Sequence, residues 1–133
     1  MNTISYEPTN VTPYVYFNPD NGVFEIKGRS LPDTSILFYQ PILSALENYA
    51  KDDNPGITAN FAFEYFNTSS SKCLFDVFKR LNKVAETGRD ITINWYFEEG
   101  DDDMMEAGED YSDLLDLDFN FYEIEEDDDD YWA

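Results

Sequence analysis

Several stretches of the chain have the hydrophobic pattern of β-strands. Residues 90–97 alternate cleanly between hydrophobic and polar side chains, and residues 57–66 carry hydrophobic side chains along one side. Residues 13–17 and 23–28 are β-prone and flank Asn21-Gly22, which supplies the positive φ angles of a tight reversal. We therefore predict an N-terminal hairpin and two further strands. The side chains expected to face the core from these two strands are Ile57, Ala59, Phe61, Phe63, Tyr65, Ile91, Ile93, Trp95 and Phe97.

Two other stretches repeat hydrophobic residues at helical spacing. The first begins at residues 30–33, where a serine precedes an acid as at a helix start, and it runs to Ala50. Pro41 lies inside this stretch and is expected to kink the helix or restart it. The second stretch follows the hydroxyl residues 68–71 and ends at Gly88. We predict a helix for each stretch.

The remaining elements complete a single α/β domain. A short helix is predicted within the acid-rich residues 98–116, because acids crowd its first turn, and residues 119–124 are a candidate for a last extended segment. The predicted order is β-β-α-β-α-β-α, with helices packed on one mixed sheet. We assign residues 1–124 to this domain and residues 125–133 to an acidic, disordered tail.

The charge of the chain is concentrated in its last third. The formal net charge is −21; residues 1–89 hold ten acids and eight bases, whereas residues 90–133 hold nineteen acids and no base. Such a field repels nucleic-acid phosphates and anionic lipids, so it disfavours both as ligands. Proteins with basic surfaces are the partners that this charge favours.

The cysteine and hydropathy content point to a cytoplasmic protein without bound metal. Cys73 is the only cysteine and there is no histidine, which excludes an internal disulfide, a cysteine-based zinc cluster and any catalytic triad that uses histidine. No stretch approaches the roughly 18 apolar residues needed to cross a bilayer. We predict no cofactor, no metal and no membrane insertion.

The most informative junction lies between the strand that ends near residue 66 and the following helix. Four consecutive hydroxyl residues, Thr68 to Ser71, occupy it. The start of a helix has unpaired N–H groups and partial positive charge, which suit a phosphate. The alternative interpretation is that the run Thr68 to Ser71 is a plain helix cap. Within the run, we expect Ser69 and Ser70 to be the capping residues. Lys72 lies four residues after Thr68 and is expected to approach a phosphate there.

Three other interpretations of the acidic residues remain open. Asp101 to Asp103 lack the spacing of a calcium loop, and we expect a helix start. Glu64 with Asp110 could act as the acid and base of a small enzyme, which needs a pocket that separates their proton affinities. Residues 98–130 could instead mimic a nucleic acid and block a protein that binds one.

Four runs of residues together resemble the SiaC family of regulatory phosphoproteins. They are Gly28-Arg29-Ser30, Glu64-Tyr65-Phe66-Asn67-Thr68-Ser69-Ser70-Ser71-Lys72, Trp95-Tyr96, and Glu106-Ala107-Gly108-Glu109-Asp110-Tyr111. The similarity extends from about Thr12 to Phe119 in the same order. The tail, residues 125–133, has no counterpart in the family pattern.

The resemblance implies a non-enzymatic bacterial signalling protein that switches partners. A dedicated kinase would phosphorylate Thr68, a PP2C-type phosphatase would remove the phosphate, and the unphosphorylated protein would bind an output enzyme such as a diguanylate cyclase, in c-di-GMP signalling. The implied fold is similar to that of STAS-type anti-sigma-factor antagonists. The expected phosphosite and partner-binding residues are Thr68, Asn67, Ser69, Ser70, Ser71, Lys72, Arg29 and Glu64. The output partner, the sign of regulation and the oligomeric state stay open.

Overall fold

A computed structural model describes residues 3–125. It contains a six-stranded sheet with three helices. The elements are β1 (Ile4–Tyr6), β2 (Tyr14–Asn18), β3 (Val23–Ser30), α1 (Ser35–Lys51), β4 (Ile57–Phe66), α2 (Thr68–Glu86), β5 (Ile91–Glu98), α3 (Asp102–Leu115) and β6 (Phe119–Ile124). The predicted α/β class and order are confirmed. The structure adds β1, which is too short to show a sequence pattern, and makes the candidate segment 119–124 a strand. The predicted tail, apart from Glu125, lies outside the described residues.

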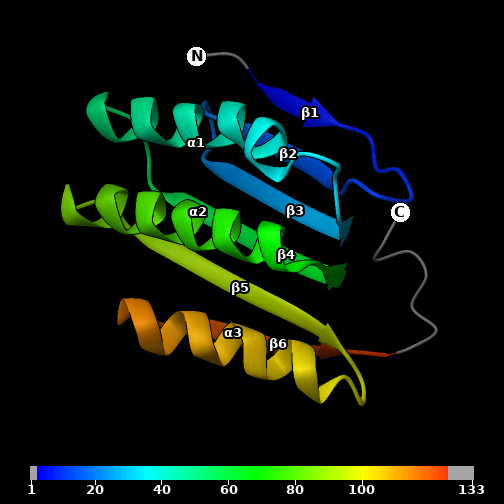
Figure 1. The fold of residues 1–133 in the computed structure, drawn as a ribbon. Helices are drawn as coiled ribbons and strands as arrows, with labels where there is room; N and C mark the ends of the chain where they lie inside the picture. The colour runs from blue at the N-terminus through cyan, green and yellow to red at the C-terminus, as the bar shows by residue number, and fades with distance from the viewer. Residues whose placement is uncertain (1–2, 126–133) are drawn as a thin grey trace.

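The strands lie in the sheet in the same order as in the chain. β1, β2 and β3 are antiparallel neighbours, whereas β3, β4, β5 and β6 are parallel. Each parallel connection contains one helix and moves in the same direction across the sheet. Because such crossovers are almost always right-handed, all three helices lie on one face, as Figure 1 shows. The domain therefore has two layers.

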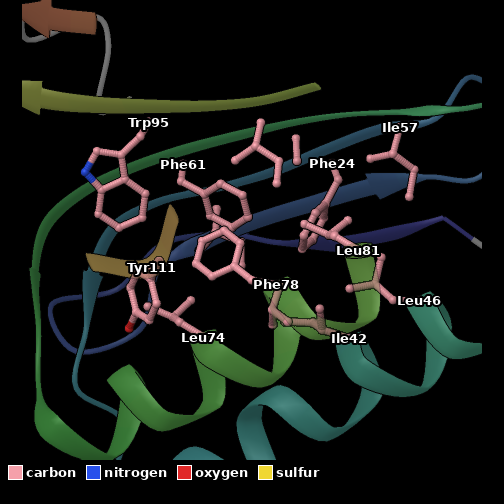
Figure 2. Close-up of a cluster of buried hydrophobic side chains, with 14 of the residues drawn as sticks. Phe24, Ile42, Leu46, Ile57, Phe61, Leu74, Phe78, Leu81, Trp95 and Tyr111 are labelled. Carbon is pink, nitrogen blue, oxygen red and sulfur yellow. The ribbon is translucent and has the colours of Figure 1, made fainter. Parts of the chain in front are cut away.

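The core fills the space between the sheet and the helices. Trp95 from β5 is fully buried, and it contacts aromatic rings from β4, α2 and α3 (Figure 2). Its indole Nε1 donates to the carbonyl oxygen of Met104, at 2.9 Å, which fixes α3 on the sheet. The rings around the indole belong to Phe61, Phe63, Phe66, Phe78, Tyr111 and Phe119.

Helix α1 begins later than the sequence predicts. Ser30 is the last residue of β3 and pairs with Phe66 of β4, so it is not a helix cap. Pro32 disfavours helical backbone at the residue before it, and the helix starts only at Ser35. Pro41 lies within one continuous helix, so the predicted restart is wrong. The inward residues on both sides of Pro41, Tyr39 and Ile42, are fully buried, and their packing offsets the lost hydrogen bond.

The end of β4 also differs from the predicted alternation. Gly28 pairs with Phe63 and Arg29 pairs with Tyr65, so Glu64 is an extra residue, as in a β-bulge. Gly28 has a φ of 108°, which a residue without a side chain adopts most easily. The bulge turns Tyr65 outward, where it is 47% exposed, instead of into the core. Phe66 then packs inward against Phe63, with ring centroids 5.2 Å apart.

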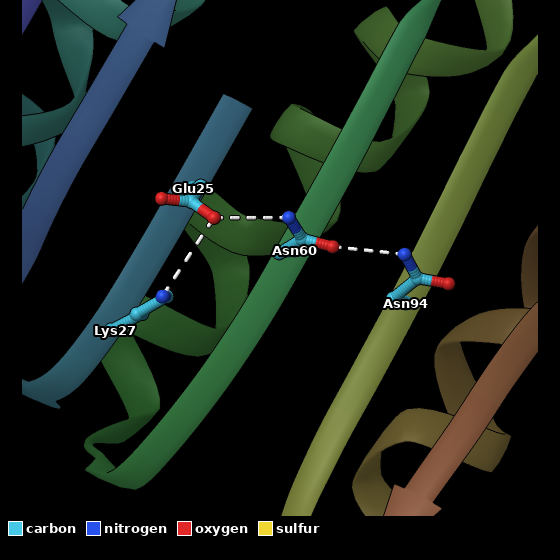
Figure 3. Close-up of polar contacts among 4 residues, drawn as sticks. All are labelled: Glu25, Lys27, Asn60 and Asn94. Carbon is cyan, nitrogen blue, oxygen red and sulfur yellow. Dashed lines mark hydrogen bonds and ion pairs between the residues drawn. The ribbon is translucent and has the colours of Figure 1, made fainter. Parts of the chain in front are cut away.

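The face of the sheet opposite the helices is polar. Asn60 donates to Glu25 at 3.0 Å, Asn94 donates to Asn60 at 2.8 Å, and Asn120 donates to Asn94 at 3.1 Å. These residues lie at matching positions on β3, β4, β5 and β6. The Glu25 carboxylate, which accepts the hydrogen bond from Asn60, also lies 3.7 Å from the Lys27 ammonium group (Figure 3). The side-chain ladder therefore connects four parallel strands.

Candidate functional site

The site begins where β4 passes into α2. Asn67 is the N-cap of α2, and its Oδ1 accepts a hydrogen bond from the Ser70 amide at 2.9 Å. The backbone N–H of Asn67 donates to the backbone carbonyl of Ser30 at the end of β3, at 3.0 Å. The interpretation of Ser69 and Ser70 as the caps is therefore wrong, because the asparagine before the hydroxyl run takes this role. Thr68 becomes the first residue of the helix.

Ser70 is fully buried and belongs to a chain of hydroxyl groups. The Ser30 hydroxyl donates to Ser70 Oγ at 2.9 Å, and Ser70 Oγ donates to the Ser30 carbonyl at 2.9 Å. Since a hydroxyl has one proton, the Tyr39 hydroxyl must donate to Ser30 Oγ, 2.6 Å away. Burial raises the pKa of Tyr39, which keeps this donor protonated. Ser70 thus joins α1, β3 and α2.

Ser69 and Ser71 also have structural partners. Ser69 Oγ donates to Asn67 Oδ1 at 3.2 Å and lies 2.7 Å from the hydroxyl of Ser35, at the start of α1. The Tyr111 hydroxyl of α3 donates to the Ser71 carbonyl at 2.8 Å and lies 3.0 Å from Ser71 Oγ. Burial, partly offset by the hydrogen bond with Ser71, raises the pKa of Tyr111 to about 12. The two serines connect α2 to the helices on either side.

Thr68 differs from the three serines that follow it. Its side chain is exposed, and its hydroxyl makes no hydrogen bond to another residue within the described range 3–125. The backbone amides of Thr68 and Ser69 likewise donate to no other described residue, as expected in the first turn of a helix. A phosphate on Thr68 could therefore accept hydrogen bonds from these two amides and would be favoured by the helix dipole.

The predicted basic residues lie in different surroundings. Lys72 is exposed and lines a groove of about 500 Å³ together with Ile36, Thr68, Ser69, Cys73 and Asp76. Arg29 lies 3.6 Å from the Glu64 carboxylate, its Nε donates to the Asn10 carbonyl at 3.1 Å, and its guanidinium lies over the Tyr65 ring. Of the two, the structure brings Lys72 into the groove with Thr68.

The acidic residues do not form a joint catalytic or metal site in the described part of the chain. Glu64 and Asp110, the candidate acid and base, line different grooves. Asp101 is the N-cap of α3, and its carboxylate accepts from the Met104 amide at 3.1 Å. Residues 3–125 contain no group of three or more acidic, cysteine or histidine side chains that could hold a metal ion. Cys73 is buried, and this burial raises the pKa of its thiol.

Sequence reasoning missed Tyr39, Tyr111, Ser30 and Ser35 as parts of this site. The last two residues of the hydroxyl run and the buried tyrosines come from three different helices, and only the fold brings them together. Tyr111 did carry a signal, because it ends the run Glu106 to Tyr111 that resembles the family. The pairing of Tyr111 with Ser71 is not readable from that run.

We expect removal of the helix cap to weaken the domain without unfolding it. Asn67→Ala should lower the free energy of unfolding by about 1 kcal/mol, because the Ser70 amide loses its acceptor. Asn67→Asp keeps an acceptor oxygen at the same place and should change the free energy by much less. Urea unfolding of both variants measures the difference. Equal losses in the two variants would show that the cap does not stabilise α2.

No helix within residues 3–125 is long and apolar enough to span a membrane. A family model described as "SiaC family regulatory phosphoprotein" matches residues 6–124. An uncharacterized protein of Pseudomonas aeruginosa (strain UCBPP-PA14) is 22% identical over 111 residues, which are 84% of this chain and 88% of that protein.

Three solved structures from Pseudomonas aeruginosa have a similar fold. SiaC matches with a TM-score of 0.81 at 22% identity, covering 94% of this chain and 99% of that chain. Apo-SiaC matches with a TM-score of 0.76 at 21% identity, covering 92% and 98%. A crystal structure of the diguanylate cyclase SiaD in complex with its activator SiaC matches with a TM-score of 0.85 at 20% identity, covering 91% and 99%.

Proposed function

This chain belongs to the SiaC family of regulatory phosphoproteins, and we propose that it is a non-catalytic switch whose state is set by reversible phosphorylation of Thr68. The proposal includes a kinase that adds the phosphate and a PP2C-type phosphatase that removes it. It also includes an output enzyme that binds the unphosphorylated form. The protein contributes binding, and the chemistry belongs to its partners.

One observation carries the choice of Thr68. Of the four consecutive hydroxyl residues, Ser69, Ser70 and Ser71 each make side-chain hydrogen bonds that hold α2 to neighbouring elements, namely α1, β3 and α3. The Thr68 hydroxyl has no such bond within the described residues, and it is exposed. A kinase could therefore modify Thr68 without breaking a structural contact, whereas modification of buried Ser70 would require the junction to open.

The surroundings of Thr68 also favour a phosphate once it is attached. The amides of Thr68 and Ser69 are available as donors at the start of a helix of 19 residues. Lys72 lines the same groove and can form a charge-assisted hydrogen bond with a phosphate oxygen. Together these groups would hold the phosphate at the surface while leaving α2 intact.

The output enzyme that we propose is a diguanylate cyclase. The support is the complex of SiaD with its activator SiaC, because the matched chain shares the fold of this domain along nearly its whole length. The field of a chain with net charge −21 favours a partner with a basic surface. Cytoplasmic location is part of the proposal, since c-di-GMP signalling partners would have to meet the protein there.

Phosphopeptide mapping tests the proposal. After incubation with the kinase and ATP, we expect one major phosphate, on Thr68. Thr68→Ala should accept almost none, whereas Ser69→Ala should be modified as well as the unchanged protein, because Ser69 bonds Ser35 and Asn67 rather than serving as an acceptor. Mass spectrometry of the peptide with residues 67–72 reads the result. A phosphate found mainly on Ser69, Ser70 or Ser71 would overturn the assignment.

A further inference from the structure

Helix α1 exposes two large aliphatic side chains on its first turn. Ile36 is 69% exposed and Leu37 is 71% exposed. The buried stripe of this helix consists of Ser35, Tyr39, Ile42, Leu46 and Tyr49. Because Ile36 and Leu37 lie outside that stripe, the core gains nothing from their hydrophobic character. Single exposed aliphatic residues are common on proteins, so their position relative to the phosphosite decides what they mean.

Ile36 lies beside Thr68. Ile36 and Thr68 line the same groove of about 500 Å³, whose other walls come from the first turns of α2. The hydroxyls of Ser35 and Ser69 lie 2.7 Å apart and hold the start of α1 against the start of α2. The two helices lie side by side on the sheet (Figure 1). Ile36 is therefore fixed next to the hydroxyl that we propose to be modified, and Leu37 follows it in the first turn of α1.

We propose that Ile36 and Leu37 form the docking patch by which the unphosphorylated protein binds its output enzyme. The inference rests on the proposed function and adds to it the surface and the chemistry of the partner. The partner would contribute aliphatic side chains that enter the groove, flanked by lysine or arginine residues. The apolar centre fits the exposed pair, and the basic flanks fit the acidic residues 90–133 rather than the groove itself, whose lining holds one base and one acid, Lys72 and Asp76.

This placement links the patch to the switch. Thr68 lines the groove, so a partner side chain that covers Ile36 also removes water from the Thr68 hydroxyl. Removing water from a neutral hydroxyl costs far less free energy than removing it from a charged group. A phosphate, which carries about −1.5 to −2 charges, would have to lose much of its hydration beside aliphatic groups, which is strongly unfavourable. The same patch can therefore bind in one state and reject the partner in the other.

Serine variants test the patch against a matched control. Ile36→Ser, Leu37→Ser and the double variant remove the aliphatic groups, whereas Leu114→Ser removes a leucine that is 72% exposed on α3. Helix α2 separates α3 from α1 (Figure 1). Affinity for a SiaD-type diguanylate cyclase from the same organism is measured by titration calorimetry at low and high salt. Circular dichroism and phosphorylation of Thr68 by the kinase confirm that each variant is folded.

We expect the double variant to bind at least about tenfold more weakly, since burial of aliphatic side chains is worth this much at a well-packed contact. Leu114→Ser should remain within about twofold of the unchanged protein. Added salt should weaken binding of the unchanged protein. Unaltered affinity of the double variant, an equal loss in Leu114→Ser, or binding that strengthens with salt would each overturn the patch while leaving the switch at Thr68 intact. If phosphorylation of the unchanged protein has no effect on binding, the proposed function fails instead.

Discussion

Phosphorylation of Thr68 is expected to weaken binding of the output enzyme by about a hundredfold or more, which corresponds to about 2.7 kcal/mol. The phosphate adds about −1.5 to −2 charges at a position where the unmodified protein has an exposed hydroxyl with no hydrogen bond to any other residue among 3–125. A contact fitted to that hydroxyl would have to bury the new charge or move away from it. Removing water from a charged group that lacks a full set of hydrogen-bond partners reduces the binding free energy by several kcal/mol.

The fold should hardly respond to the same modification. The backbone amides of Thr68 and Ser69 can donate hydrogen bonds to the phosphate, and the positive end of α2 favours its charge, so stability should hold or rise by about 0.3–1 kcal/mol. Calorimetric titration of the phosphorylated and unmodified forms, with circular dichroism on each, separates binding from folding. Thr68→Ala is the matched control and should bind in both the presence and absence of kinase. Equal affinity of the two phosphorylation states for the output enzyme would contradict the switch.

Gly108→Ala is expected to lower the free energy of unfolding by about 2 kcal/mol or more. Alanine favours helices over glycine by about 1 kcal/mol, so an unconstrained helix would gain stability. At this position, however, a Cβ atom would lie 2.6 Å from Cδ1 and Nε1 of Trp95, inside the closest approach of real atoms. The indole is fully buried and packed on several sides, so α3 would have to move outward.

The outward movement would also strain a specific hydrogen bond. Trp95 Nε1 donates to the Met104 carbonyl one turn earlier in α3, and a shifted helix lengthens that contact. Glu109→Ala introduces an alanine at the exposed neighbouring position, where there is no clash with Trp95, and should change stability by less than about 0.5 kcal/mol. Urea unfolding, monitored by tryptophan fluorescence, compares the free energies of unfolding of the two variants. A more stable Gly108→Ala protein would show that α3 does not approach the sheet this closely.

The sequence predicts the parts of the fold that follow from a regular pattern. Residues 90–97 alternate without interruption, and the strand that forms there, β5, spans Ile91–Glu98; the hydrophobic spacing of residues 74–84 gives the buried side of α2. The prediction for Tyr65 was wrong because the bulge at Glu64 shifts the pattern by one residue. A bulge leaves no hydrophobic signature in the sequence, since it depends on the register of the neighbouring strand.

The candidate site, like the fold, can be predicted from the sequence only in part. The position of Thr68 at a strand-to-helix junction follows from local sequence, because the strand pattern ends and a capping residue follows. The distinct roles of the four hydroxyls do not, because Ser30, Ser35 and Tyr111 reach them from distant parts of the chain. The order of the run could not show that Asn67, rather than a serine, is the cap, since both residue types are good N-caps.

Each strand of this sheet pairs only with its neighbours in the chain, and this order bears on how the protein acquires its structure. Val23 meets Thr58, and Ile57 meets Ile91, so each parallel pairing closes one strand-helix-strand unit. Among residues 3–125, no strand pairs with one that is distant in the chain order. Closing one strand-helix-strand unit at a time loses less chain entropy than joining distant strands first. During synthesis, each new strand leaves the ribosome when the strand it pairs with is already present, so the sheet can grow in the direction of translation.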